Sequence, residues 1–428
     1  MTAVAAEREL DGKPPPSTTK EIESPIETVF PEELEKRPLF PRLRERVRDL
    51  PPFFADMQIE ARYRTYYLDK DRPSDVRSEA WAMGGSVYFE SGWFEDVFAM
   101  EMEGFTSQPI HAPDDRGGTL LLEPVQSGYS ALGIANGKLR YQGLELVGFR
   151  QYLDLPYLNR SDIRMTPNTF ESITLAKPEG ELRLTTGYTW NVKLRNSDEF
   201  VSMTEVLGLE KDRGVAHGGV IWEPDENFRV GAIMAAIPDV LAGLYSEVGV
   251  GRDLTKKLQA RFDGQFTYQW EVGDDLLGER LDDAWVLGLR AAASYQSVVL
   301  RVGTSVTGPD ATILNAYGTN PSYVDLMQRS FNRPDEKSLL ASVSYDFSRF
   351  GAHGLTAVVN FVAGFDGKLT GGERADSQEI DVTLDYRVTK GRLANLWLRA
   401  RGSWLSDDAG EQDGTDFRFI LRYDFPVL

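Results

Sequence analysis

The feature that most constrains the fold is a strict alternation of apolar and polar side chains, which recurs in segment after segment beyond residue 56. Successive side chains of a β-strand point to opposite faces, so a period of two residues predicts strands with one apolar and one polar face. In 57–66, Ile59 and Tyr63 share the apolar face, while Arg62 and Arg64 share the polar face. A chain built in this way is predicted to be all-β.

The number of alternating segments predicts about 18 strands, each near the ~9–11 residues of a tilted membrane strand, although about 16 strands would fit the same pattern. The alternation is clearest in 57–68, 181–194, 256–271 and 415–426. No uncharged apolar run reaches the ~20 residues that a spanning helix needs. We therefore predict a transmembrane antiparallel up-and-down β-barrel, most simply of about 18 strands.

The connections between the predicted strands differ in length from one end of the barrel to the other. Short, turn-like connections rich in Gly, Pro, Asp and Asn alternate with a second set that includes long loops, and only 237–239 breaks this rule. Short turns at one end and long loops at the other are typical of outer-membrane barrels. The short set is 92–95, 142–144, 177–181, 224–226, 252–255, 349–353 and 389–393, and the long loops are 106–134, 152–167, 195–215, 307–337 and 366–378.

The first 52 residues differ from the rest, so we divide the chain into an N-terminal extension, 1–52, and a barrel, 53–428. The extension contains Pro14–Pro16, Ser/Thr/Glu-rich stretches and a short charged candidate helix, 31–50, that prolines interrupt. We expect it to be partly disordered, with a plug or a partner-binding segment as the alternative. Because its first residues are polar and acidic, we expect the natural signal peptide to have been removed.

Composition excludes several classes of function. The formal net charge of −19 disfavours nucleic-acid binding. The chain has no cysteine and only three scattered histidines, His111, His217 and His353, so we expect no disulfide, metal or cysteine-nucleophile site. The sequence lacks GxSxG, HExxH, P-loop and Rossmann patterns. We therefore predict no cofactor and no catalysis, and we rank a barrel-embedded hydrolase as a distant third hypothesis.

The polar faces of four predicted strands carry a candidate solute pathway. Closure of a barrel places the first strand beside the last, so arginines from both ends of the sequence would line one wall of the lumen. A row of guanidinium groups offers an anion successive stopping points that it can enter and leave. The predicted ladder consists of Arg62, Arg64, Arg387, Arg399, Arg401, Arg418 and Arg422.

A structural role for the same arginines remains open at this point. Acidic residues alternate with them on the same faces, so the guanidinium groups could form ion pairs that brace the barrel wall. The two interpretations are compatible if different arginines serve different purposes. The interleaved acids are Glu60, Asp381, Asp385, Asp416 and Asp424.

Three stretches resemble one known family, the OprD-type outer-membrane porins, which are substrate-specific channels of pseudomonads and their relatives. The first, LVGFRQYLDLPYLNRSDIRMTPNTFESITL followed by LRNS at 194–197, contains an Asp-x-Arg-x-x-Pro motif at Asp162, Arg164 and Pro167. The second is SFNRPDEKSLLASVSYDFSRFGAHGLT, and the third is the tail from EIDVTLDYRV to DFPVL. The resemblance extends from about residue 52 to the end of the chain.

This resemblance implies an 18-stranded monomeric barrel in the outer membrane, in contact with its lipids. It also implies that the third and seventh loops fold inward and that a basic ladder guides small carboxylate or amino-acid-like solutes. By the same resemblance, the constriction would involve Asp162, Arg164, Tyr323, Asp325, Arg329 and Arg333. Our leading hypothesis is a passive channel for small anionic or zwitterionic solutes, and the alternative is a closed or plugged barrel that serves as a binding or structural protein.

Overall fold

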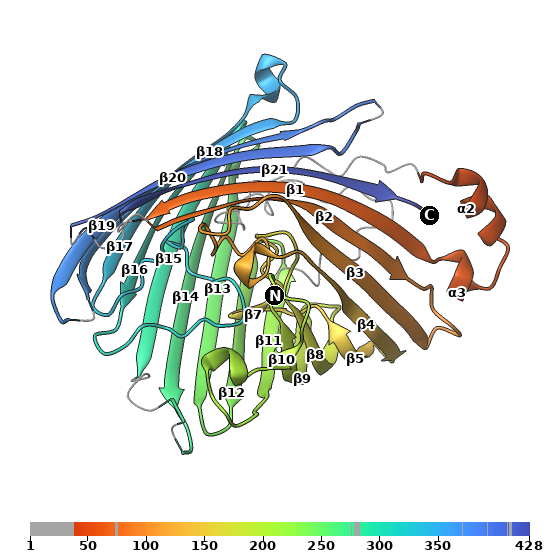
Figure 1. The fold of residues 1–428 in the computed structure, drawn as a ribbon, viewed down its shortest axis with the longest axis horizontal. Helices are drawn as coiled ribbons and strands as arrows, with labels where there is room; N and C mark the ends of the chain where they lie inside the picture. The colour runs from red at the N-terminus through yellow and green to blue at the C-terminus, as the bar shows by residue number, and fades with distance from the viewer. Residues whose placement is uncertain are drawn as a thin grey trace.

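The protein forms a closed antiparallel barrel in a computed structural model that describes residues 38–72, 76–274, 276–277, 283–369, 371–391, 393–408, 410 and 413–428. Eighteen long strands make up its wall within these residues. Each strand pairs with its neighbour in sequence, and β1 (Gln58–Arg72) closes the barrel by pairing with both β2 (Val76–Glu90) and β21 (Gly414–Pro426). Figure 1 shows β1, β2, β20 and β21 side by side along one wall. The predicted barrel topology and strand number are confirmed.

The remaining strands follow in chain order, and β6, β7 and β10 are two-residue strands inside loops. Two short helices, α2 (Pro41–Val47) and α3 (Pro52–Ala55), precede the barrel. The other long strands are β3 (Phe98–His111), β4 (Tyr129–Tyr141), β5 (Leu144–Gln151), β8 (Thr169–Lys177), β9 (Leu182–Lys193), β11 (Val215–Asp225), β12 (Phe228–Ile237), β13 (Leu241–Thr255), β14 (Leu258–Glu271), β15 (Ala284–Tyr295), β16 (Val298–Thr307), β17 (Lys337–Asp346), β18 (Leu355–Lys368), β19 (Arg374–Arg387) and β20 (Trp397–Asp407). The short ones are β6 (Asp154–Leu155), β7 (Leu158–Asn159) and β10 (Val201–Ser202).

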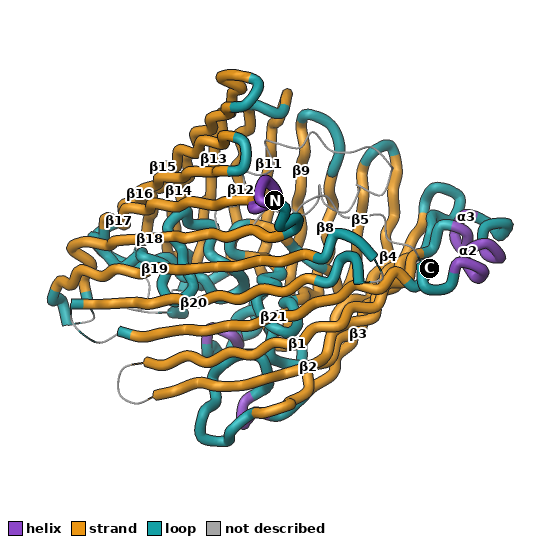
Figure 2. The backbone as a smooth tube through the Cα atoms, turned by 90° about the horizontal axis from the view of Figure 1, so that it is seen from above, coloured by secondary structure: helices purple, strands orange, loops and turns teal. Residues whose placement is uncertain are grey.

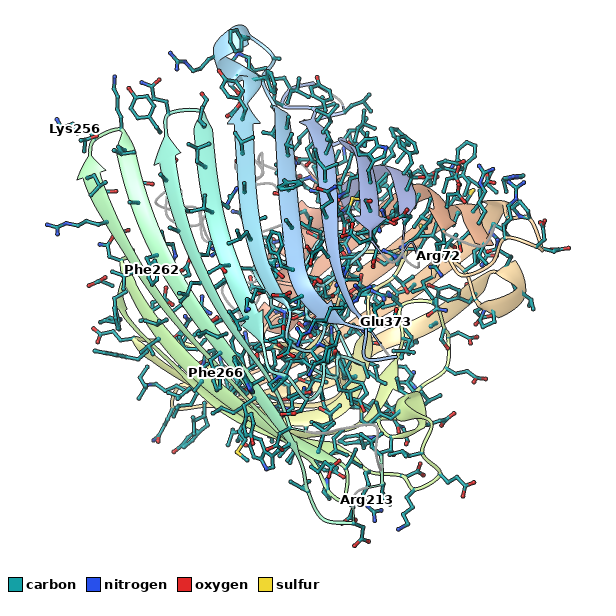
Figure 3. The ribbon with its side chains drawn as sticks, turned by 90° about the vertical axis from the view of Figure 1, so that its left-hand side faces the viewer. Arg72, Arg213, Lys256, Phe262, Phe266 and Glu373 are labelled. Carbon is teal, nitrogen blue, oxygen red and sulfur yellow. The ribbon has the colours of Figure 1, made fainter. Side chains whose placement is uncertain are left out.

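The two faces of each strand follow the alternation of the sequence. In β1, Tyr66 and Leu68 are 2% exposed on the inward row, whereas Tyr63 on the outward row is 37% exposed. In β14, Phe262 and Phe266 lie on the outward row (Figure 3), and the intervening polar residues face inward. Nearly all of the described regular structure is β-strand, and the described helices are short (Figure 2). The period of two therefore separates an apolar exterior from a polar interior.

The two ends of the barrel differ as predicted, with short turns at one end and the long loops at the other. Lys256, in a short turn, and Arg213, in a long loop, mark these opposite ends in Figure 3. Two predicted loops are too long, however. Strands β3 and β4 leave only 112–128 between them instead of 106–134, and β18 and β19 leave 369–373 instead of 366–378. At the end of β3 and at the facing ends of β18 and β19, polar residues lie on both faces, so the alternation fades before the hydrogen-bonded pairing does.

Two long loops fold back and pack inside the wall. Loop 152–168 and loop 308–336 contribute apolar side chains to buried clusters with the strands around them. In the first cluster, Leu155, Leu158 and Tyr317 pack with residues that include Phe170 and Ile233. Burying these side chains favours the folded-in position of both loops. The interior is thus narrowed by the chain itself.

The N-terminal segment is helical over a shorter stretch than predicted. Of the candidate helix 31–50, only α2 is helical among the described residues, and 31–37 lie outside them, as does most of the predicted extension. The prolines at 38 and 41 explain the late start, because proline fits the first turn of a helix but not its interior.

No helix in the described part of the chain is both long enough and apolar enough to cross a membrane.

Candidate functional site: the arginine-lined lumen

The structure places all seven predicted ladder arginines on the inward rows of β19, β20, β21 and β1. Pairing of β1 with β21 brings Arg64 opposite Arg422, and pairing of β20 with β21 brings Arg401 opposite Arg418. Arg387 lies on the inward row of β19, where it is half-buried. Four adjacent strands therefore present one continuous basic wall to the lumen. Whether this wall is a solute pathway stays a prediction.

Five of these arginines form ion pairs with neighbouring carboxylates. The Arg399 guanidinium lies 2.7 Å from an oxygen of Asp385 and over the ring of Trp397, 4.6 Å from its centroid. The Arg418 and Asp416 side chains meet at 2.7 Å. Such paired groups are largely neutralised, so they brace the wall more than they attract solutes. The other pairs are Arg62–Asp424 at 3.1 Å, Arg422–Asp424 at 2.8 Å and Arg64–Asp162 at 2.6 Å.

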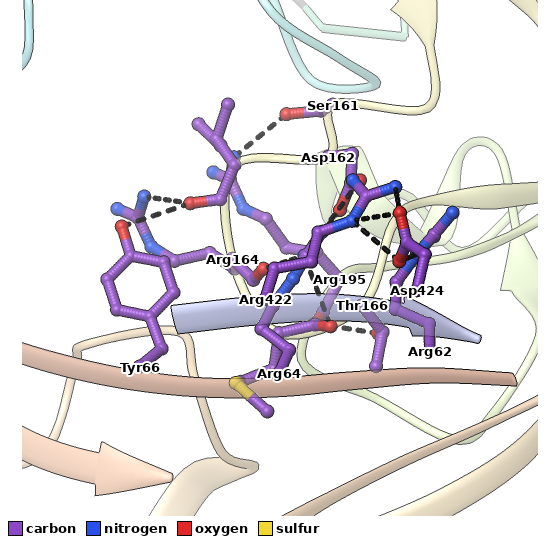
Figure 4. Close-up of polar contacts among 12 residues, drawn as sticks. Arg62, Arg64, Tyr66, Ser161, Asp162, Arg164, Thr166, Arg195, Arg422 and Asp424 are labelled. Carbon is purple, nitrogen blue, oxygen red and sulfur yellow. Dashed lines mark hydrogen bonds and ion pairs between the residues drawn. The ribbon is translucent and has the colours of Figure 1, made fainter. Parts of the chain in front are cut away.

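The Arg64–Asp162 pair holds loop 152–168 against the basic wall (Figure 4). Two nitrogens of Arg64 donate to the two oxygens of Asp162, at 2.6 and 3.0 Å. One of them also donates to the backbone carbonyl of Arg164. Burial alone would raise the pKa of Asp162, but the guanidinium of Arg64, with those of Arg62 and Arg422, holds that pKa at about 2. The pair therefore stays ionised throughout the physiological range.

Three other arginines near this loop bond only to neutral oxygens. Arg164 donates from Nε to the carbonyl of Thr119 at 2.9 Å, and Arg195 donates to the hydroxyl of Ser161 at 3.0 Å. Arg401 donates from Nε to the hydroxyl of a threonine at 3.1 Å. Among the residues that the structure describes, no carboxylate lies within ion-pairing distance of any of the three. We call Arg164, Arg195 and Arg401 the unpaired arginines.

The charge of Arg418 acts on both unpaired arginines of the loops, Arg164 and Arg195. Burial, followed by the repulsion of Arg418, lowers the pKa of Arg164 to about 9. The same two causes lower the pKa of Arg195. Both groups remain protonated at neutral pH. A bound anion would relieve this repulsion, so the arrangement favours a negatively charged guest.

Loop 308–336 is attached to the inner face of β19 and β20. Carboxylate oxygens of Glu379 accept hydrogen bonds from the backbone N–H groups of Gln328, at 2.9 Å, and Arg329, at 3.1 Å. The Arg329 side chain pairs with Glu336 at 2.7 Å, and Arg333 pairs with Asp407 at 2.5 Å. Arg329 and Arg333, two of the three arginines predicted for the constriction, thus hold this loop in place.

The remaining two residues predicted for the constriction lie in the same loop. Tyr323 is buried, and the guanidinium of Arg290 lies 4.5 Å from its ring centroid. Burial, and then the nearby carboxylate of Asp381, raise the pKa of Asp325 to about 7, although a hydrogen bond from Ser330 opposes the shift. Asp325 is therefore the loop residue whose charge changes near neutral pH.

The two inward loops touch each other inside the barrel. Leu158 pairs with Tyr317 in a parallel bridge. The side-chain amide of Asn159 donates to the carbonyl of Thr319 at 3.1 Å, and the N–H of Thr319 donates back to the amide oxygen of Asn159 at 2.9 Å. One loop is anchored to β1 and the other to β19, so the two joined loops lie inside the barrel beside the basic wall. That they form the constriction stays a prediction.

The sequence analysis missed two parts of this interior. Arg195 follows β9 and lies in the LRNS stretch, 194–197. The family resemblance of this stretch was the one sequence signal that could have pointed to Arg195. The second part is a set of inward arginines on β12 and β14–β16 that interleave with acids. For example, Arg261 and Arg290 both pair with Asp263, at 2.7 and 2.8 Å. The other members of the set are Arg229 and Arg301.

The described residues contain no group of three or more His, Asp or Glu side chains that could hold a metal ion.

Comparison with known proteins agrees with this architecture. The family model described as an outer membrane porin of the OprD family matches residues 51–427. Porin D of Pseudomonas aeruginosa is 22% identical over 413 residues, which cover 88% of this chain and 92% of that protein.

Solved structures share the fold. OccK9 (OpdG) of Pseudomonas aeruginosa superposes with a TM-score of 0.82 at 24% identity, over 88% of this chain and 100% of that one. OpdK of the same species, determined with vanillate, gives 0.79 at 21% identity, over 87% and 100%. A BenF-like porin from Pseudomonas fluorescens Pf-5 gives 0.80 at 20% identity, over 87% and 100%. With a family match that covers nearly the whole barrel, this chain belongs to the OprD family of outer membrane porins and is a channel protein rather than an enzyme.

Proposed function

We propose that this porin takes up small carboxylate solutes, anionic or zwitterionic, by passive diffusion along the arginine-lined wall. The observation that carries the proposal is the group of unpaired arginines, Arg164, Arg195 and Arg401, beside the constriction. None of the three forms an ion pair with a carboxylate among the described residues. A solute carboxylate would supply the missing negative charge.

The chemistry of guanidinium groups suits a transient carboxylate site. A planar guanidinium can donate two parallel hydrogen bonds to one carboxylate, which favours this shape over a spherical halide. Binding must nevertheless be weak for conduction, and neighbouring sites must be able to exchange the ion. Arg401 lies on the same wall as the paired arginines Arg399 and Arg418, and the carboxylates that hold these two would compete with a solute and keep its binding weak. The path needs no cofactor and no energy source, and we expect the barrel to work as a monomer.

One relative supports the choice of solute class. OpdK has been determined with vanillate, which is the anion of an aromatic carboxylic acid. At 21% identity this relative shares the fold with our chain, so the particular solute does not carry over. What supports the general class here is the charge pattern of the lumen.

Planar-bilayer recording of purified protein tests the proposal. Replacing Arg164, Arg195 and Arg401 together by Gln should shift the reversal potential in a benzoate or acetate gradient toward cation preference. The matched control is Lys256→Gln, which removes one positive charge from an exposed turn at the far end of β13. An unchanged reversal potential in the triple variant would refute the proposed role of these arginines.

A closed barrel is the second candidate, because the two inward loops hydrogen-bond to each other inside the barrel. If the loops seal the lumen, the purified protein will show no unitary current in any salt. Deleting 312–322, which removes the contact between the loops, should then open a current. Unitary current from the intact protein excludes this alternative.

A further inference from the structure

The two helices that precede the barrel lie at its short-turn end, outside the wall. Figure 1 shows α2 and α3 beyond the ends of β1 to β3 and next to the C-terminus. Backbone hydrogen bonds attach them there: the N–H of Leu39 donates to the carbonyl of Pro426 at 2.8 Å, and the N–H of Gly92 donates to the carbonyl of Phe53 at 2.9 Å. In an outer membrane porin, the short-turn end faces the periplasm. The helices therefore sit at the periplasmic rim.

Aromatic packing shows which side of the rim the helices occupy. The ring of Phe53 in α3 stacks on the ring of Phe98, with centroids 6.4 Å apart, and meets Phe94 edge-on. Phe98 begins the outward row of β3, because its neighbour Ala99 is buried on the inward side. The helical segment is thus continuous with the lipid-facing surface rather than with the lumen.

The same segment exposes a group of large apolar side chains. Each of the five is between 44% and 55% exposed, although they lie within a stretch of sixteen residues. A cluster of this kind is unfavourable in water but fits the boundary between headgroups and acyl chains. The five are Leu39, Phe40, Leu43, Leu50 and Phe54.

Basic residues accompany these apolar side chains. Arg42, Arg46 and Arg48 are exposed, whereas the neighbouring Arg44 donates to the carbonyl of Met57 at 2.7 Å and is partly buried. The acidic residues within 39–50 are Glu45 and Asp49, so this stretch carries net positive charge in a chain whose total is −19. Arginine pairs readily with phosphate, and a basic amphipathic helix is typical of a membrane-surface segment.

We infer that α2 and α3 form an interfacial anchor for anionic phospholipids of the periplasmic leaflet. Leu39, Phe40, Leu43, Leu50 and Phe54 enter the acyl boundary, while Arg42, Arg46 and Arg48 bind lipid phosphates. The assignment rests on two observations: charge complementarity to an anionic headgroup and continuity with the lipid-facing row through Phe98. It is independent of which solute the channel carries.

Hydrogen–deuterium exchange on the full-length protein tests the anchor. The porin is reconstituted in nanodiscs of phosphatidylcholine alone or with one third phosphatidylglycerol, and amide exchange is measured for 39–55. We expect exchange to be several-fold slower with phosphatidylglycerol. The variant Arg42→Gln/Arg46→Gln/Arg48→Gln should lose this difference, whereas Arg349→Gln, in an exposed turn at the same end, should keep it.

A second variant separates the apolar contribution from the charge. Phe40→Ser/Leu43→Ser should raise exchange of 39–55 in both lipids, and heat-modifiable gel mobility confirms that each barrel has folded. Equal exchange in both lipid mixtures would overturn the assignment of an anionic lipid. Protection that is already complete in detergent, or that grows with protein concentration, would also overturn it, because the chain itself or a second copy would then cover this surface.

Discussion

The lumen holds two kinds of arginine, paired and unpaired, and the proposed function gives the first kind a structural role and the second a role in transport. Arg64, Arg399 and Arg418 face carboxylates at 2.6 to 2.7 Å and hold the wall and a loop together. Arg164 and Arg195 bond only to neutral oxygens; Arg164 lies in the inward loop 152–168, and Arg195 lies just after β9. A paired arginine stabilises the pore, whereas an unpaired one leaves its charge available to a passing solute. The type of residue alone does not distinguish the two roles.

The largest effect is expected where a paired arginine anchors a loop. Arg64→Gln leaves Asp162 without its partner, and breaking a mostly buried pair, with Asp162 partly exposed, costs about 2 kcal/mol. The amides of 160–166 should then exchange about 30-fold faster, since every ~1.4 kcal/mol is a factor of ten. Unchanged exchange in this loop would show that its packing, not the ion pair, holds it in place.

Removal of an unpaired arginine should change selectivity and leave the structure intact. Arg164→Gln should lower the anion-to-cation permeability ratio about two- to fivefold, the effect of one charge several ångströms from the path. Exchange of 160–166 should match the wild type. Arg349→Gln, in an exposed turn, is the charge-matched control for bilayer recording. Loosening of the loop in Arg164→Gln would contradict the distinction between the two kinds of arginine.

A paired arginine can also be converted into an unpaired one. Asp162→Asn keeps a hydrogen-bond acceptor for Arg64 but removes its counter-charge, so anion preference should rise about twofold. Because the pKa of Asp162 is lowered from 3.8 to about 2, its ion pair contributes stability above its ordinary value and loses it only as pH falls through 2. Asp162 should therefore cause no pH dependence of wild-type selectivity between pH 5 and 8. A fall in anion preference in the variant would contradict the prediction.

The smallest expected effect is a pH dependence near neutrality. Because the pKa of Asp325 is raised to about 7, raising the pH from 6 to 8 adds a negative charge to loop 308–336 and should reduce anion flux by up to about twofold. By linkage, the folded loop is favoured at low pH and loses this stabilisation as pH rises through 7. In Asp325→Asn, the anion flux should change little between pH 6 and 8. An equally strong pH dependence in this variant would show that another group causes it.

The sequence predicted the barrel well because the bilayer imposes a simple period. An outward row must be apolar and an inward row polar, so strands such as β1 and β14 could be assigned with their faces from local sequence. The predicted strands left out the facing ends of β18 and β19, because polar residues occupy both faces there. The wall of arginines followed from closure of the barrel, which is a topological inference.

The constriction was less predictable because loops have no period. Arg329 and Arg333 could be assigned to the inward loop by family resemblance, but their attachment to Glu336 and Asp407 depends on side-chain contacts. Arg195 was missed because its partner, Ser161, lies in another loop. The partner of a strand arginine can lie only two residues away, as in Arg418–Asp416, whereas the partners of a loop arginine depend on long-range contacts that a linear sequence does not display.

The seam between β1 and β21 has a consequence for biogenesis. The pair Arg62–Asp424 joins residues 362 positions apart, and the last strand supplies Arg418 and Arg422 to the basic wall. Two of the seven arginines of that wall are therefore missing until the final strand has been synthesised, exported and inserted. If this wall selects the solute, as we propose, a nascent barrel held open at the seam lacks part of its filter as well as its seal, so selectivity and closure are completed in the same step of assembly.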